Sequence, residues 1–193
     1  MIAEAPRQGV GSFFRALVGF VDEKGLRTPV WEAVSPETRA LIDDPPRPLA
    51  FIPSKPIDEI EAALHRITSE QVLVDCGLAC ARPLGWSLLA PVLHVAFTLF
   101  GPSPAPILGN LDRFFSLVTR GISFQWSESE PDRSGIVTAT FQGDGTPEAA
   151  YHVLRGSLLF AFEVCGIVGQ VGPPEVVESS PSASVVRYAV KWG

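Results

Sequence analysis

The period of the apolar positions changes near residue 121. Before it, apolar residues recur at the three- and four-residue spacing of amphipathic helices, as in VGSFFRALVGFV and SKPIDEIEAALHRI. After it, ISFQWSE and GIVTATFQG alternate apolar and polar residues, which is typical of strands with one buried face. The turn residues of SEPDRSG stand between these two segments, so the pair is predicted to form an antiparallel hairpin.

A strong helix follows this hairpin. In TPEAAYHVLRGSLLFAFEVCG, Thr146 is the expected N-cap, Pro147 takes the first helical position and Gly166 is the expected C-terminal stop. The second half of the segment is apolar nearly all round, so we expect the helix to be sandwiched between layers. The segments IVGQVGPPEVVES and SVVRYAVKW then alternate again and are predicted to form a second hairpin.

Together these elements predict an α+β fold. Residues 8–121 form a helical N-terminal two-thirds, and residues 122–193 form a hairpin–helix–hairpin part. We expect the two hairpins to join into a four-stranded antiparallel sheet packed on helices. The length predicts a single domain that spans residues 1–193.

Proline and glycine divide the helical part into short elements. Ser35 and Pro36 provide an N-cap and a first helical residue for SPETRALI. Residues 43–56 are too rich in proline to be helical and are predicted to cross the surface as an ordered strap. The apolar residues expected to pin this strap to the core are Leu49, Phe51 and Ile52.

The remaining apolar segments of the helical part are predicted as three separate helices: SEQVLVDCGLACA, PLGWSLLAPVLHVAFTLFG and PAPILGNLDRFFSLVT. The second of these approaches the length of a membrane span between Leu84 and Phe100. Pro91 and His94 lie within that run and favour a buried core helix instead. No membrane span is predicted.

Composition excludes several classes of protein. Hydrophobic residues make up 46% of the chain and charged residues 19%, so the chain is not disordered as a whole. A net charge of -6 without a run of Lys or Arg argues against nucleic-acid binding. The N-terminus lacks the layout of a signal peptide, and the three cysteines cannot all pair within one chain. We therefore expect a cytoplasmic protein with reduced thiols.

His94 is the one ionisable residue of the longest apolar run. A buried imidazole needs a hydrogen-bond partner, because an unpaired one pays the cost of losing its water. A backbone carbonyl freed by Pro91 would satisfy it as well as a ligand would. His94 is therefore either a satisfied core residue or a residue that lines a pocket or binds iron. His65 and His152 are expected at surface or boundary positions.

The other chemistry-bearing side chains have structural interpretations. Cys76 and Cys80 lie four residues apart on one helix, but two further metal ligands with recognisable spacing are missing, so both are expected to be small core residues and no metal is predicted. The carboxylates gather in the helix that contains Ile57 and in SESEP, where we expect solvated faces. The arginines in or beside apolar helices are expected to pair with carboxylates or, in a pocket, to hold a carboxylate ligand: Arg15, Arg113, Arg120 and Arg155.

Catalytic motifs are missing from the sequence. It contains no GxSxG, no HExxH and no Walker lysine, and its titratable residues are isolated along the chain. No catalytic residue is predicted, and an enzyme is the least favoured class of function.

Four short stretches carry a resemblance to known proteins. VGSFFRAL, ARPLGWSLL, RGSLLFAFEVCG and the closing YAVKW resemble a family of uncharacterised proteins of similar length from myxobacteria. That family is similar to the ligand-binding superfamily of haem-NO-binding and 4-vinyl-reductase proteins, which the TRAPP trafficking subunits also resemble. The resemblance implies a compact α+β domain with a hydrophobic cavity between helices and sheet, which in this superfamily accepts haem, a tetrapyrrole precursor or an acyl chain.

The haem-binding branch has a proximal His, a later Pro and a Tyr-x-Ser-x-Arg signature. Here His94 and Pro106 follow that order, but the corresponding region reads LVTRGISFQW, without the Tyr or the Ser–Arg pair. Haem bound through His94 is therefore not the predicted cofactor, and the identity of any cofactor is left open.

Two functional hypotheses follow. The first is a regulatory or sensor-type module that binds a hydrophobic small molecule, such as an acyl chain or a tetrapyrrole, between the 83–101 helix, the 146–165 helix and the sheet. Its expected ligand-binding residues are His94, Trp86, Phe97, Phe124, Trp126, Phe141, Arg113 and Arg155. The second is a TRAPP-like interaction scaffold, a homodimer or an adaptor, which would expose Phe13, Phe14 and Trp31 as one patch for a protein partner.

Overall fold

The structure is a computed structural model that describes residues 7–100, 103–129, 133–143 and 145–193, without the side chains of 87–100. Its helices are α1 (Gly11–Glu23), α2 (Arg27–Ala33), α3 (Pro36–Asp43), α4 (Lys55–Ile67), α5 (Glu70–Phe100), α6 (Pro104–Leu108), α7 (Leu111–Phe115) and α8 (Glu148–Cys165). Its strands are β1 (Gln8–Val10), β2 (Phe51–Pro53), β3 (Thr119–Arg120), β4 (Ile122–Ser129), β5 (Ser134–Gln142), β6 (Gly169–Val171), β7 (Glu175–Ser179) and β8 (Ala183–Trp192).

The C-terminal hairpins form one antiparallel sheet, which confirms the α+β prediction. Its strand order is β4-β5-β8-β6, and β7 pairs with β8 as well. The two hairpins join through β5 and β8, where Val137 lies opposite Tyr188. The outer position beside β8 is shared by β6 and β7, because Pro173 and Pro174 stand between them and cannot donate to a ladder.

A second, smaller sheet ties together three distant segments. Its strand order is β2-β1-β3, so the strap that contains β2 pairs with β1 near the N-terminus. Ile52 is buried and Phe51 is half-buried, as expected for residues that hold the strap. Leu49 is 78% exposed, so its predicted role in pinning the strap is wrong.

The helical part differs from the prediction at two places. The segments around Cys80 and Leu84 belong to one helix of 31 residues, α5, which continues through Pro83 because packing against α8 offsets the lost backbone hydrogen bond. The predicted helix after Pro104 is divided into α6 and α7. The division follows Gly109, where the side-chain amide of Asn110 donates to the carbonyl of Pro106 at 2.8 Å.

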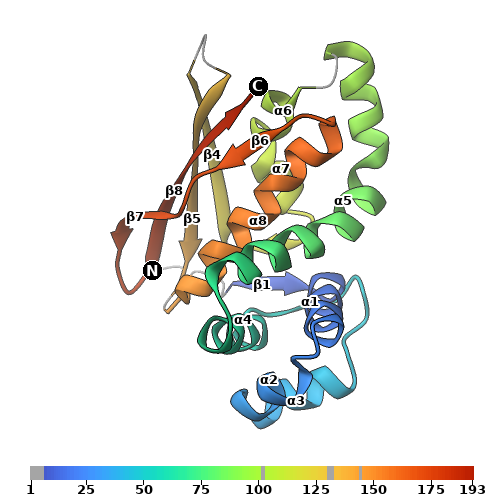
Figure 1. Cartoon of the computed structure of the whole chain (residues 1–193), viewed down its shortest axis with the longest axis vertical. Coiled ribbons are helices and arrows are strands. Elements are labelled where there is room, and N and C mark those ends of the chain that lie inside the picture. Colours follow the sequence, from blue (N-terminus) through green and yellow to red (C-terminus); the bar gives the residue numbers. More distant parts are fainter. Residues whose placement is uncertain (1–6, 101–102, 130–132, 144) are drawn as a thin grey trace, which may run out of the picture.

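Helix α8 lies between the sheet and α5, as its all-round apolar surface predicts (Figure 1). One face of α8 contributes to a core with the sheet that includes Leu158 and Tyr188, and the other contributes to a core with α1, α4 and α5 that includes Phe14 and Leu73. Gly166 ends α8 with a φ of 65°, in the left-handed region that favours glycine.

Candidate functional site

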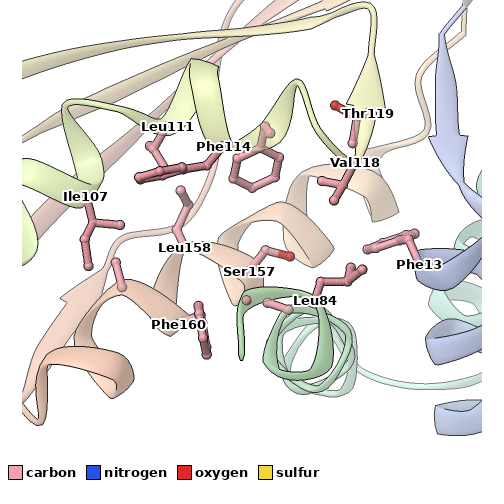
Figure 2. A pocket seen from close by; sticks show the side chains of 14 residues that line it. Phe13, Leu84, Ile107, Leu111, Phe114, Val118, Thr119, Ser157, Leu158 and Phe160 are labelled. Carbon is pink, nitrogen blue, oxygen red and sulfur yellow. The ribbon is translucent and has the colours of Figure 1, made fainter. Parts of the chain in front are cut away.

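An apolar cavity lies between α5, α8 and the α6–α7 segment, and Figure 2 shows it from close by. Its volume is about 100 Å³. The wall is apolar except for the hydroxyls of Ser157 and Thr119. The apolar residues labelled in Figure 2 are Phe13, Leu84, Ile107, Leu111, Phe114, Val118, Leu158 and Phe160.

Glycines bring the two long helices together beside this cavity. A Cβ atom at Gly77 would lie 1.8 Å from the Val153 carbonyl oxygen, and one at Gly156 would lie 1.9 Å from the Val74 carbonyl oxygen. The backbones of α5 and α8 are therefore in direct contact. The Ser157 hydroxyl donates across this contact to the Gly77 carbonyl at 3.2 Å.

Small residues continue along α5 toward the cavity. Ala81 lines it, and Gly85 packs against the Phe160 ring, where a Cβ would lie 2.0 Å from a ring carbon. The opposite wall comes from α6 and α7. Asp112 fixes α7 to the sheet by accepting the backbone N–H of Phe124 at 3.0 Å. Both long helices thus contribute small and large residues to the wall, α5 through Gly85 and Leu84 and α8 through Ser157 and Phe160.

A second chamber of about 70 Å³ adjoins the first. Phe13, Phe115, Thr119 and Ser157 line both, so the two chambers are neighbours across these four side chains. The second chamber differs in being polar at its far wall, where Arg7, Asp58 and Glu61 lie. None of these three residues was predicted as part of a site.

Of the acidic residues of this chamber, Glu61 is buried and Asp58 is half-buried. Asp58 accepts hydrogen bonds from Arg7 at 2.8 Å and from Ser54 at 3.0 Å, and burial raises its pKa although Arg7 opposes the shift. Glu61 is 3% exposed, and burial raises the pKa of its carboxyl well above the usual range. The prediction that the carboxylates of this helix are solvated is therefore wrong for Glu61. Because Glu61 lies four residues after Ile57, it falls on the apolar face.

The predicted aromatic site residues are spread over the core and the surface. Phe124 and Phe141 are buried, Trp126 is half-buried, and Trp86 is 53% exposed with its ring edge-on to Phe160. Phe141 lines the second chamber. Phe124 and Trp126 pack in the core between the sheet and α7. The side chains of His94 and Phe97 lie outside the described residues.

The two arginines that were predicted to bind a ligand, Arg113 and Arg155, have different surroundings. Arg113 is exposed on α7. Arg155 is half-buried, and its Nε donates to the Val171 carbonyl at 2.8 Å, which fixes α8 to β6. Arg155 faces an open groove beside β6 and β8 rather than either chamber.

His152 was expected at a surface or boundary position, but its side chain is buried. Its side chain is 3% exposed, and within the described part of the chain neither ring nitrogen has a hydrogen-bond partner. Glu70 lies 3.9 Å from Nδ1, Glu148 lies 4.0 Å from Nε2, and the His65 ring is 5.8 Å away. Burial lowers the pKa of His152, whereas the two carboxylates oppose that shift.

Cys76 and Cys80 lie in the core, as expected, and Cys165 is buried as well. Cys76 and Cys80 are fully buried, and a hydrogen bond to Cys80 together with burial raises the pKa of the Cys76 thiol well above its usual range. Burial raises the pKa of the Cys165 thiol to about 11. Among the residues that the structure describes, no group of three or more His, Cys, Asp or Glu side chains could hold a metal ion.

The apolar cavity does not fit haem. Cofactor pockets usually begin at about 300 Å³, and the apolar cavity is about 100 Å³. Within the described ranges its wall contains no Arg, Lys or His that could bind propionates or iron. The described residues also include no helix that is long and apolar enough to cross a membrane.

Solved structures share this fold over nearly the whole chain. A variant of the unliganded Fe(II) H-NOX protein from K. algicida aligns with a TM-score of 0.69 and 11% identity, over 95% of this chain and 96% of that one. An oxygen-binding H-NOX domain related to soluble guanylate cyclases, in its oxygen complex, aligns with a TM-score of 0.61 and 11% identity over 94% of each chain. No protein-family profile and no curated protein matches the chain. The chain therefore resembles the haem-NO-binding superfamily in its fold, as the sequence predicts.

Proposed function

We propose that this chain is a non-enzymatic, sensor-type module that binds a small apolar molecule in the cavity between α5, α8 and the α6–α7 segment. The observation that carries the proposal is the cavity itself, which has an apolar wall and lies where two tightly packed helices meet a separate layer. Apolar pockets with few polar groups are the usual form of small-molecule sites.

The volume favours a small guest. A cavity of about 150 Å³ lined by Leu, Ile and Phe binds benzene or xenon. The two chambers here, of about 100 and 70 Å³, suit a molecule of that size or a short acyl chain that occupies both. A tetrapyrrole is too large for either chamber.

The positions of the lining residues suggest how binding would be sensed. Phe13 of α1 contacts the same cavity as residues of α7 and α8, so a guest would touch the N-terminal helices and the layer that covers the sheet at once. A guest that binds more tightly at one spacing of these elements would shift the population of conformations toward that spacing. Binding would then be detected as a change in the position of α1.

The scaffold alternative has less support. Phe14 is fully buried and Phe13 lines the cavity. Trp31 is 36% exposed, but the Arg39 guanidinium lies over its ring at 4.5 Å. The three aromatic residues therefore do not form the exposed patch that a docking surface of this kind requires.

Benzene binding tests the proposal. We expect saturating benzene to raise the melting temperature of the wild type, because a ligand that binds only the folded state stabilises it by mass action. Ala81→Leu should abolish the increase, since Ala81 lines the cavity. Ala40→Leu, on the exposed side of α3, is the matched control and should keep the increase.

Extraction and mass spectrometry of the purified protein identify a natural guest. An apolar molecule that is enriched with the wild type and lost from Ala81→Leu supports the proposal. A wild-type melting temperature that benzene leaves unchanged would argue that the interior is closed to guests and would overturn it.

A further inference from the structure

The second chamber combines aromatic rings with polar groups, which lie both at its junction with the first chamber and at its far wall. Phe13 and Phe115 lie where it adjoins the first chamber, and Phe141 lines its wall. A molecule that entered from the apolar cavity would meet the Thr119 and Ser157 hydroxyls at the junction of the two chambers, and the carboxyl of Glu61 beyond it.

Two of these polar groups lack hydrogen-bond partners among the described residues. Thr119 Oγ1 is buried and has no hydrogen-bond partner in the described part of the structure. Glu61 is 3% exposed, and its carboxyl forms no hydrogen bond with another described residue. Buried polar groups are normally hydrogen-bonded, so an unpaired hydroxyl and an unpaired carboxyl facing one chamber indicate a missing partner.

The charges of the chamber decide which partner fits. Arg7 and Asp58 form an ion pair at 2.8 Å, and Asp58 is also bonded to Ser54. The positive charge of Arg7 is therefore already matched. Burial raises the pKa of the Glu61 carboxyl well above its usual range and so favours its neutral form, which leaves the chamber without an unmatched charge to attract an ion.

We propose that the second chamber binds the hydroxyl group of a neutral alcohol whose short apolar tail occupies the first chamber. The hydroxyl would donate one hydrogen bond and accept another, which matches the unpaired Thr119 hydroxyl and Glu61 carboxyl. This inference rests on the proposed function and adds to it the chemical class of the guest.

A pair of isosteric probes tests the inference. Benzyl alcohol and ethylbenzene have similar shapes, but only benzyl alcohol has a hydroxyl. We expect Thr119→Val to weaken benzyl alcohol binding about tenfold, as loss of a buried hydrogen bond does, and to leave the dissociation constant of ethylbenzene unchanged. Glu61→Leu should act in the same way, whereas Glu61→Gln, which keeps a neutral hydrogen-bonding group, should retain most of the affinity for the alcohol.

Calorimetric titration of each variant provides the measurement, with Thr140→Val as the matched control because Thr140 is half-buried on β5 and lines neither chamber. If Thr119→Val weakens the binding of both probes equally, or of neither, the second chamber does not recognise the hydroxyl. The inference is then overturned while the proposed function stands. If benzoate binds more tightly than benzyl alcohol, Arg7 holds an anion and the inference fails. If the wild type binds none of the probes, both proposals fail.

Discussion

Substitution of Gly77 by alanine should separate α5 from α8. A Cβ at this position would lie 1.8 Å from the Val153 carbonyl oxygen and 2.7 Å from its carbon, whereas ordinary contacts begin at 3.4 Å. Backbone atoms of a helix cannot move aside as a flexible side chain can. The two helices would therefore have to move apart by more than an ångström along their most extensive contact.

The expected cost exceeds the gain in helix propensity. Overpacking of a close contact costs about 1–3 kcal/mol, whereas replacing Gly by Ala inside a helix contributes about 0.5–1 kcal/mol. We therefore expect Gly77→Ala to lower the free energy of unfolding by about 1–2 kcal/mol. Gly156→Ala should behave similarly, because its Cβ would lie 1.9 Å from the Val74 carbonyl oxygen.

Gly19→Ala isolates the propensity effect. Gly19 lies in α1, is exposed, and has no atom within 4 Å of the position of a Cβ, so its substitution should stabilise the protein by about 0.5–1 kcal/mol. Urea unfolding followed by circular dichroism measures all three variants. Equal stabilities of Gly77→Ala and Gly19→Ala would refute the close packing of α5 on α8.

Three further predictions concern buried titratable groups and haem. Glu61→Gln should raise the urea midpoint of unfolding at neutral pH but not below about pH 4.3, the usual pKa of an exposed Glu. Burial raises the pKa of Glu61 in the folded state, so the wild type loses stability as the pH rises above the usual pKa of Glu. An equal effect of the substitution at neutral and at acidic pH would contradict this. His152→Gln should reduce the loss of stability that occurs as the pH falls below about 6.5, the usual pKa of His. Burial lowers the pKa of His152 in the folded state, so protonation favours the unfolded chain. If the free energy of unfolding of the variant depends on pH as steeply as that of the wild type, the prediction is wrong. Haem supplementation should leave the purified protein without a Soret band, and a band that disappears in His94→Ala would overturn the argument from the cavity wall.

Local sequence signals predicted much of this fold. The alternation in β4 and β5 and the apolar surface of α8 depend on spacing along the chain, so they could be found without knowledge of the fold. The cap at Ser35 could be found in the same way, and its side chain accepts the N–H of Thr38 at 3.3 Å. Such features depend on neighbours within a few residues.

The candidate site was harder to predict because its parts come from distant segments. Arg7 meets Asp58 across 51 residues, and the burial of His152 depends on the packing of α8 against α4 and α5. The continuation of α5 through Pro83 also depends on a partner helix rather than on local preference. The burial of Glu61 is the feature of the site that a local pattern indicates, since Glu61 occupies an apolar position of α4, next to Ile60 and four residues after Ile57.

The pairing of β1 with β3 has a consequence for the order in which the chain folds. Gln8 and Arg120 are 112 residues apart, yet their side chains bond across this pair of strands. Closing so long a loop costs entropy that local helices do not incur, and non-local strand pairing is slow for that reason. During synthesis the first strand leaves the ribosome early and must wait for β3. The smallest sheet of the protein should therefore be among the last elements to form.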